Sequence, residues 1–184
     1  MPDYIIFKND TIATYNLILE QFFEKTQPDT TNKLFGLSFR GGASFNCWRG
    51  YQAIYKIDHD SLFLVDIINC GERRAGIIDK AASLKKMKEI FGERVLGERV
   101  YINWFSGDIS FPLNNTVVRW DGVFYTIYEK ETVVNISEGR ILKQEEVENY
   151  IDDPKSIDRK NKNKIAAILF KKLKKTRWKN PEIC

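Results

Sequence analysis

The chain has 184 residues, of which 43% are hydrophobic and 29% are charged. This composition is typical of one folded domain with a small appendage, and it excludes an intrinsically disordered chain. The net charge of +4 is unevenly spread, because residues 155–184 carry 11 basic and 2 acidic side chains, a local charge of +9. Residues 1–154 hold the other 18 basic and 23 acidic side chains, a charge of −5.

The first residues lack the basic and apolar regions of a secretory leader, and no apolar run approaches the roughly 20 residues that span a bilayer. These features predict a cytoplasmic protein of bacterial type with no transmembrane segment. The three cysteines, Cys47, Cys70 and Cys184, are too few and too far apart to predict a disulfide framework.

The first half of the chain predicts one short strand, two helices and one β-hairpin. In chain order these are a strand at 4–7, a helix at 17–25, a hairpin at 50–68 and a helix at 79–91. The hairpin turns at Asp58-His59-Asp60. Asp79 can cap the second helix, and Gly92 can end it.

The middle of the chain predicts a meander of short strands at regular spacing. The strands are expected at 100–105, 108–111, 116–120, 124–129, 132–136 and 140–142, with Asp121-Gly122 as a hairpin turn. Strands and helices do not alternate, so a parallel sheet is not expected. The fold class is therefore α+β, mainly an antiparallel meander sheet, barrel-like or a sandwich, with flanking helices. We expect this β-rich domain to occupy residues 1–143.

Residues 144–184 predict a helical C-terminal extension. One helix is expected from Glu145 to Ile151. Another, from Ser156 to about Lys175, is amphipathic and basic, with lysines opposite an apolar face. Three roles stay open for this helix: packing on the sheet, docking to nucleic acid or an acidic protein, or lying on an anionic membrane. Its candidate binding residues are Lys171, Lys174, Lys175 and Trp178.

Motifs of catalysis and of metal binding are sparse. The single histidine, His59, lies in a predicted turn, which is an exposed place for acid–base chemistry. The sequence contains neither zinc ligands in paired spacing nor a glycine-rich phosphate loop. No catalytic residue, metal site or cofactor is therefore assigned, and a buried thiol is the simplest role for Cys47.

Five segments together resemble a known group of sequences. They are Cys47–Tyr51, Leu62–Asp66, Trp104–Pro112, Tyr128–Glu129 and Val134–Gly139. The group consists of small uncharacterised bacterial proteins that share a CWRGY…LFLVD…WFSGxIxFP…YE pattern. The resemblance covers about residues 46–142 and implies a shared β-rich fold, but it implies no activity.

Aromatic and arginine side chains next to one another are the candidate binding residues of the sheet. Trp48 and Arg49 stand at the start of a predicted strand, where packing in the interior is the first interpretation and a binding surface is the alternative. Trp120 follows Arg119 beside a predicted turn, and an exposed indole there would suit a partner surface.

Two classes of function remain open. The first is a non-enzymatic binding protein with an unknown protein partner, such as an immunity-type protein that neutralises a toxin. The alternative is an enzyme of unrecognised type with a carboxylate and arginine site in the mouth of a β-barrel. That alternative requires a deep pocket that gathers residues such as Arg49, Asp66, Asp108 and Arg119.

Overall fold

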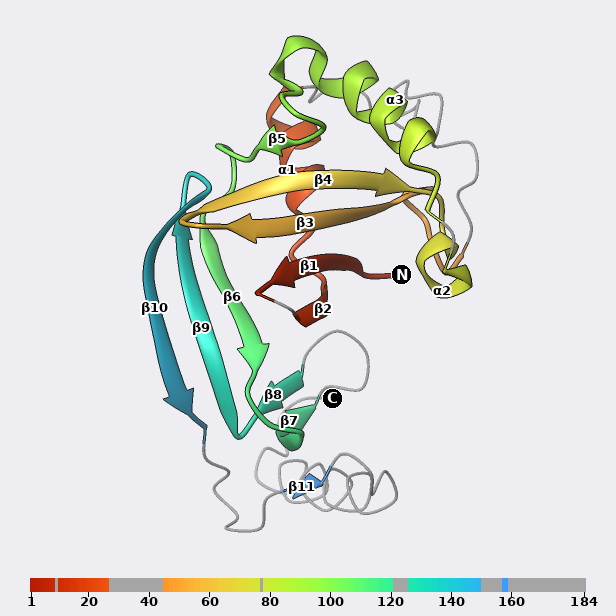
Figure 1. The fold of residues 1–184 in the computed structure, drawn as a ribbon. Helices are drawn as coiled ribbons and strands as arrows, with labels where there is room; N and C mark the ends of the chain where they lie inside the picture. The colour runs from red at the N-terminus through yellow and green to blue at the C-terminus, as the bar shows by residue number, and fades with distance from the viewer. Residues whose placement is uncertain (9, 27–44, 77, 121–125, 150–156, 159–184) are drawn as a thin grey trace, which may run out of the picture. The chain divides into compact units, whose positions relative to one another are not determined.

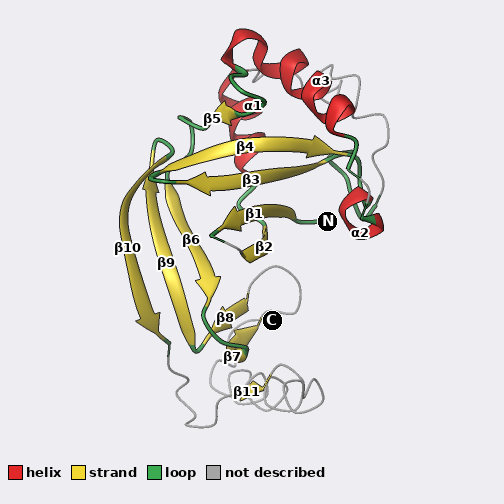
Figure 2. Cartoon of the chain, viewed as in Figure 1, coloured by secondary structure: helices red, strands yellow, loops and turns green. Residues whose placement is uncertain are grey.

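The computed structural model of the chain describes residues 1–8, 10–26, 45–76, 78–120, 126–149 and 157–158 (Figure 1). The chain divides into two compact units. Unit 1 comprises residues 1–109 and 134–143, and unit 2 comprises residues 110–133 and 144–184. The α-helices of the described residues all belong to unit 1 (Figure 2).

Four strands from the first 68 residues form one side of the main sheet. They are β1 (Asp3–Phe7), β2 (Asp10–Thr14), β3 (Gln52–Asp58) and β4 (Ser61–Ile68), in the order β2-β1-β3-β4. The predicted hairpin at 50–68 is confirmed, because β3 and β4 pair antiparallel with Ile57 opposite Leu62. The strands β1 and β3 pair in parallel. The expectation of no parallel pairing was therefore wrong at this one place, since the long connection between them lets β1 and β3 run in the same direction.

Helices α1 (Ile18–Thr26), α2 (Glu72–Ala75) and α3 (Lys80–Phe91) belong to unit 1. The two longer ones confirm the helices that the sequence predicts. Asp79 accepts the Ala82 N–H at 3.0 Å as the N-cap of α3, and Gly92 follows its last residue with a φ of 52°. At the start of α1, the Tyr55 hydroxyl accepts the Leu19 N–H at 3.0 Å, so a side chain from β3 satisfies one of the free N–H groups of the first turn.

Aromatic rings join α1, α3 and the segment after β5 (Val100–Tyr101) in the core of unit 1. Trp104 lies 4.8 Å from Phe22 and 5.4 Å from Phe91 between ring centroids. Its indole N–H donates to the Ile18 carbonyl at 2.8 Å. Trp104 and Phe105 are both buried, whereas strand alternation predicts that only one of them faces the core. The chain leaves strand geometry after Tyr101, so the alternation does not apply there.

The main sheet continues beyond β4 as β10 (Arg140–Glu148), β9 (Lys130–Ser137) and β6 (Gly107–Pro112). Each of these strands has residues in both units. The predicted turn between β9 and β10 is confirmed, and Gly139 adopts a φ of 78° there. Strand β10 runs to Glu148, so the helix expected from Glu145 was wrong over residues 145–148. Pairing with β9 overrides the helical pattern of this glutamate-rich stretch.

Unit 2 contains a three-stranded sheet in the order β11-β7-β8. The strands are β7 (Thr116–Trp120), β8 (Thr126–Tyr128) and β11 (Ile157–Asp158). The antiparallel pairing of β7 with β8 confirms that predicted hairpin. Ile157 and Asp158 pair with β7 as a strand, which corrects the expected start of the second C-terminal helix. The rest of that helix, 159–175, lies outside the described residues.

The α+β class and the mainly antiparallel sheet are thus confirmed, and a barrel-like or sandwich form stays a prediction. None of the helices in the described ranges has the length and apolar character that crossing a membrane requires.

Candidate functional site

A tight turn exposes the side chain of Trp48 and buries that of its neighbour Arg49. The Gly50 N–H donates to the Cys47 carbonyl at 3.0 Å, which closes a β-turn with Trp48 and Arg49 as its central residues. Gly50 has a φ of 75°, a conformation that glycine adopts without steric cost. The Trp48 side chain is 55% exposed, so the first interpretation, packing in the interior, was wrong for it, whereas Arg49 is only 2% exposed.

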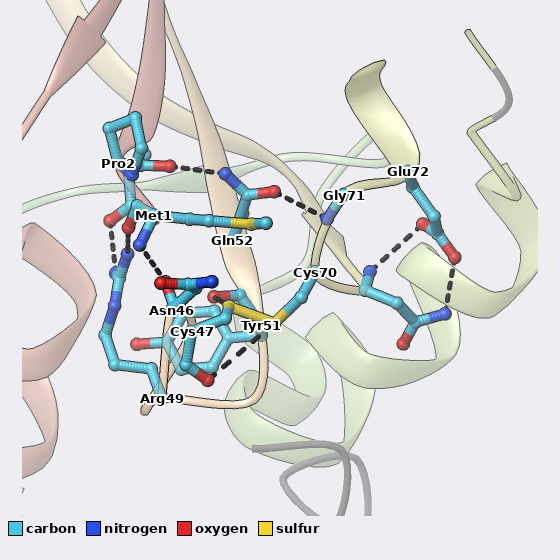
Figure 3. The surroundings of a disulfide bond; sticks show 12 residues. Met1, Pro2, Asn46, Cys47, Arg49, Tyr51, Gln52, Cys70, Gly71 and Glu72 are labelled. Atoms are coloured by element: carbon cyan, nitrogen blue, oxygen red, sulfur yellow. Dashed lines mark hydrogen bonds and ion pairs between the residues drawn. A yellow bond between two sulfur atoms is a disulfide. The ribbon is translucent and has the colours of Figure 1, made fainter. Parts of the chain in front are cut away.

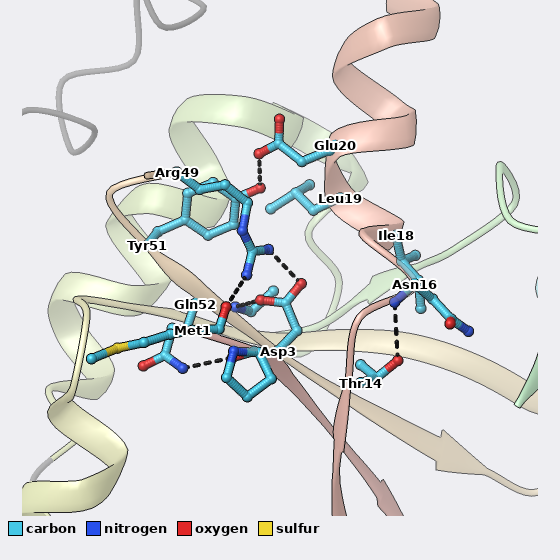
Figure 4. A network of polar contacts seen from close by, with 12 residues as sticks. Met1, Asp3, Thr14, Asn16, Ile18, Leu19, Glu20, Arg49, Tyr51 and Gln52 are labelled. Atoms are coloured by element: carbon cyan, nitrogen blue, oxygen red, sulfur yellow. Dashed lines mark hydrogen bonds and ion pairs between the residues drawn. The ribbon is translucent and has the colours of Figure 1, made fainter. Parts of the chain in front are cut away.

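Arg49 anchors the turn in the interior of unit 1 (Figure 4). Its guanidinium donates to Asp3 Oδ2 at 2.7 Å and to the Met1 carbonyl at 3.0 Å. The other Asp3 oxygen accepts the Ala53 N–H at 2.8 Å. Burial raises the pKa of Asp3, and the adjacent Arg49 guanidinium opposes that rise. Arg49 therefore holds the turn to β1 and β3, and its place in the interior argues against the binding role that the sequence suggests for it.

Two buried tyrosines extend this polar network toward α1. The Tyr51 hydroxyl donates to the Glu20 carboxylate, and Tyr55 lies beside Asp3. Burial, reinforced by the neighbouring carboxylates Glu20 and Asp3, raises the pKa of Tyr51 well above its usual value. Both hydroxyls therefore stay protonated at neutral pH and act as hydrogen-bond donors or acceptors inside the core.

A disulfide between Cys47 and Cys70 fixes the other side of the turn (Figure 3). The two Cα atoms are 6.2 Å apart, within the usual range for this bond. The interpretation of Cys47 as a buried thiol was therefore wrong, because the β3–β4 hairpin returns the chain to the place where the turn starts. The cytoplasmic location stays a prediction, and the bond weighs against it because disulfides are rare in reducing compartments.

Gln52 strengthens the same connection with two hydrogen bonds. Its amide nitrogen donates to the Pro2 carbonyl at 2.6 Å, and its amide oxygen accepts the Gly71 N–H at 2.9 Å (Figure 3). One buried side chain thus joins the N-terminal segment to the start of α2. The turn and α2 are held together by a covalent bond and by this side-chain bridge.

Helix α2 adds two arginines beside the disulfide. Arg73 lies over the Tyr4 ring, with the guanidinium carbon 4.4 Å from the ring centroid, and Arg74 is exposed. Glu72 accepts the Asn69 N–H at 3.0 Å and so fixes the start of the helix. We call residues 45–50 and 70–75 together the Trp48 corner. Its exposed side chains include Phe45, Trp48 and Arg74.

The other predicted binding residues lie elsewhere in the chain. Arg119 and Trp120 are exposed on β7 in unit 2, where Trp120 is 37% exposed. Lys171, Lys174, Lys175 and Trp178 lie outside the described residues. Their proposed contacts with nucleic acid or an anionic membrane stay predictions.

The side chains that the enzyme alternative requires are engaged separately. Arg49 is paired with Asp3, Asp66 accepts from Lys80 and Ser83, and Asp108 accepts from Asn135 at 2.7 Å. Arg119 belongs to unit 2. Among the described residues, no three metal-ligating side chains gather in one place. This arrangement lends no support to a centre that gathers Arg49, Asp66, Asp108 and Arg119 in one pocket.

No family model, curated protein or solved structure matches the chain. The resemblance to uncharacterised bacterial proteins therefore stays a prediction.

The sequence did not indicate the buried polar residues that hold the turn from distant positions in the chain. Asp3, Glu20 and Gln52 are polar residues that the structure buries, at 1%, 5% and 1% exposure. Asp3 directly precedes the apolar run Tyr4–Phe7, so the sequence offered one signal of a buried charge. The partner of that charge is 46 residues away in the chain and could not be identified without the fold.

Proposed function

We propose that the protein is a non-enzymatic binding protein that recognises a protein partner through the Trp48 corner. The observation that carries this proposal is the contrast within one turn. Trp48 is exposed while both neighbours in the chain are fixed in the interior, Cys47 by a disulfide and Arg49 by a buried ion pair.

An indole held in this way is well suited to binding. Tryptophan and arginine are the residues most enriched among those that dominate the free energy of protein interfaces. A side chain on a rigid turn loses less conformational freedom when it binds, so more of the contact free energy appears as affinity. Exposing a large apolar ring to water is unfavourable, and a partner that covers it removes that penalty.

Arg73 and Arg74 define the chemistry of the partner. The Cys47–Cys70 bond joins the start of α2 to the turn, so we expect a surface that covers Trp48 to meet positive charge from Arg74 as well. The partner expected from this arrangement offers an apolar pocket bordered by aspartate or glutamate side chains. Charges at the rim of an interface mainly accelerate association, and their effect weakens as salt increases.

The narrower form of the proposal is an immunity-type protein that neutralises a toxin. This form is supported by the fixed turn that presents Trp48 and by the engagement of Arg49, Asp66 and Asp108 in separate contacts. It requires the partner to be a protein that inhibits growth when it acts alone.

The test compares three baits in a quantitative affinity capture from cells of the source organism: the wild-type chain, Trp48→Ala and Trp120→Ala. The second variant removes another exposed indole, on β7, and serves as a matched control. A partner retained in stoichiometric amount is then purified, and its dissociation constant for each bait is measured by calorimetry.

We expect Trp48→Ala to weaken binding about 30-fold or more, as loss of a dominant interface residue does. Trp120→Ala should bind as the wild type does, and all three chains should have the same circular dichroism spectrum. The proposal fails if no protein is retained in stoichiometric amount, or if Trp120→Ala alone weakens binding. Expression of the retained protein by itself then tests the narrower form, which requires growth inhibition that the wild-type chain relieves.

A further inference from the structure

A cleft of about 230 Å³ opens in unit 1 between β4, α3 and the tight turn that precedes β5. Leu96 and Arg99 form two backbone hydrogen bonds with each other, at 2.9 and 3.2 Å, so Gly97 and Glu98 are the central residues of this turn. The volume of the cleft is below the 300 Å³ or so at which drug-sized ligands begin to fit, so the cleft suits a smaller molecule.

The floor of the cleft is apolar. Phe63 and Val65 of β4 line the cleft together with Leu84 and Met87 of α3. Leu84 and Met87 are three residues apart and so share one helix face. The Phe63 ring also makes an edge contact with Tyr101, with centroids 5.9 Å apart, which fixes its orientation.

The carboxylate at the inner end of the cleft is already satisfied. Asp66 is 3% exposed and accepts hydrogen bonds from the Lys80 ammonium and from the Ser83 hydroxyl, the latter at 3.0 Å. Ser83 also accepts the Ile67 N–H at 2.9 Å, so α3 takes the place of a neighbouring strand along this part of β4. Asp66 therefore anchors α3, and Glu98, which is exposed on the tight turn, is the other carboxylate that lines the cleft.

Two cations flank the Phe63 ring. The Arg99 guanidinium carbon lies 4.2 Å from its centroid, where a 2.7 Å ion pair with Asp58 holds the arginine in place. Lys56 lies directly opposite Phe63 in the β3–β4 register. Lys56 is exposed and forms no ion pair within the described part of the chain. An anion above this apolar floor would meet the Lys56 ammonium and the Arg99 guanidinium, both of which also interact electrostatically with Asp58.

From this juxtaposition we propose that the cleft binds a small amphipathic carboxylate, a molecule in which one carboxylate is joined to an apolar chain or ring. The apolar part lies against Val65, Leu84 and Met87, because Arg99 already lies over the Phe63 ring, and the carboxylate lies toward Lys56 and Arg99. The site uses no residue of the Trp48 corner, so it stands independently of the proposed partner surface.

The probe for the test is octanoate, added to the ¹⁵N-labelled full chain while ¹H–¹⁵N correlation spectra are recorded. Two further probes separate the contributions: 1-octanol keeps the apolar chain without the charge, and acetate keeps the charge without the chain. We expect saturable shifts at the amides of Lys56, Phe63 and Gly97 with octanoate, with a dissociation constant of about 1 mM or tighter. Octanol and acetate should bind at least about tenfold more weakly, because each lacks one of the two contacts.

Two lysine variants test whether the Lys56 charge contributes to octanoate binding. Lys56→Gln removes the cation opposite Phe63, and Lys85→Gln removes an exposed lysine of α3 that does not line the cleft. We expect the first to weaken octanoate binding about fivefold or more and the second to leave it unchanged. Trp48→Ala should also leave it unchanged, which separates this site from the partner surface.

The proposal is overturned if octanoate causes no saturable shift at the cleft amides, or if octanol shifts the same amides equally. It is also overturned if Lys85→Gln weakens binding as much as Lys56→Gln does, since binding would then follow net charge and not the cleft. Loss of partner binding in Trp48→Ala, with octanoate binding intact, would support both proposals separately.

Discussion

Arg49 and Asp3 form an ion pair at 2.7 Å in which both side chains are at most 2% exposed. The pair joins a turn to a strand that lies 46 residues away in the chain. Because the pair lies in the interior, removing either side chain leaves the other as an uncompensated charge or with unsatisfied hydrogen bonds.

Arg49→Met should lower the free energy of unfolding by about 3–5 kcal/mol, because the Asp3 carboxylate is then buried without its cation. Urea unfolding at pH 7 measures the loss. The control is Arg99→Met, which breaks the exposed pair with Asp58 and should reduce stability far less. A double variant, Asp3→Asn with Arg49→Met, should recover part of the loss. Equal effects of the two arginine variants would contradict the structural role of Arg49.

Removal of the disulfide should destabilise the native state by about 3 kcal/mol, the value expected for constraining a loop of this length in the unfolded chain. The bond closes a loop between positions 23 residues apart. Cys70→Ala is the variant, and Cys184→Ala is its matched control. Alkylation of the denatured wild-type chain, without a reductant, followed by mass spectrometry should show one modified cysteine. Three modified cysteines would contradict the bond.

Gly139→Ala should prevent the turn between β9 and β10 from packing as it does. An added Cβ would lie 1.6 Å from the Ile102 carbonyl oxygen, and the φ of 78° is itself unfavourable for alanine. Gly76→Ala is the control, because Gly76 has a similar φ of 72° but no atom lies within 4 Å of its added Cβ.

We expect Gly76→Ala to reduce the free energy of unfolding by about 1 kcal/mol and Gly139→Ala by at least about 3 kcal/mol. Thermal unfolding followed by circular dichroism compares the two. Similar losses would mean that only the backbone conformation matters at Gly139, and that the close approach to Ile102 does not.

Glu131→Gln should make unit 2 more stable at neutral pH. Glu131 is 5% exposed, and burial raises its pKa above the usual 4.5, although the Asn149 amide donates to it at 2.8 Å. The folded chain thus binds this proton more tightly than the unfolded chain does. Its contribution to stability is fully present below the unfolded pKa and is lost as the pH rises through the folded pKa.

Urea unfolding of the wild type and of Glu131→Gln, measured from pH 4 to pH 7, isolates this contribution as a difference. The stability advantage of the variant should grow as the pH rises across this range. Glu146→Gln, at an exposed position of β10, is the matched control, because it also removes one carboxylate but not a buried one. A pH-independent difference for Glu131→Gln would contradict the raised pKa.

Local sequence patterns determined the elements whose signals lie within a few residues. The β3–β4 hairpin follows from period-2 alternation around Asp58-His59-Asp60, and α3 follows from Asp79 as a cap and Gly92 as a stop. Local patterns indicated that one of Trp104 and Phe105 faces the core, whereas both are buried, and they favoured packing of Trp48 in the interior, which is wrong because its side chain is 55% exposed.

Only the tertiary structure decided how distant segments use these residues. Glu145–Glu148 became a strand because β9 was available to pair with it, although its own pattern favours a helix. The sequence by itself made Trp48 and Arg49 neighbours in the chain, but it did not show that the first side chain is exposed and the second is buried. That separation depends on Asp3 and Cys70, which contact the turn from 46 and 23 residues away, and such contacts are set by the packing of the sheet and not by local propensity.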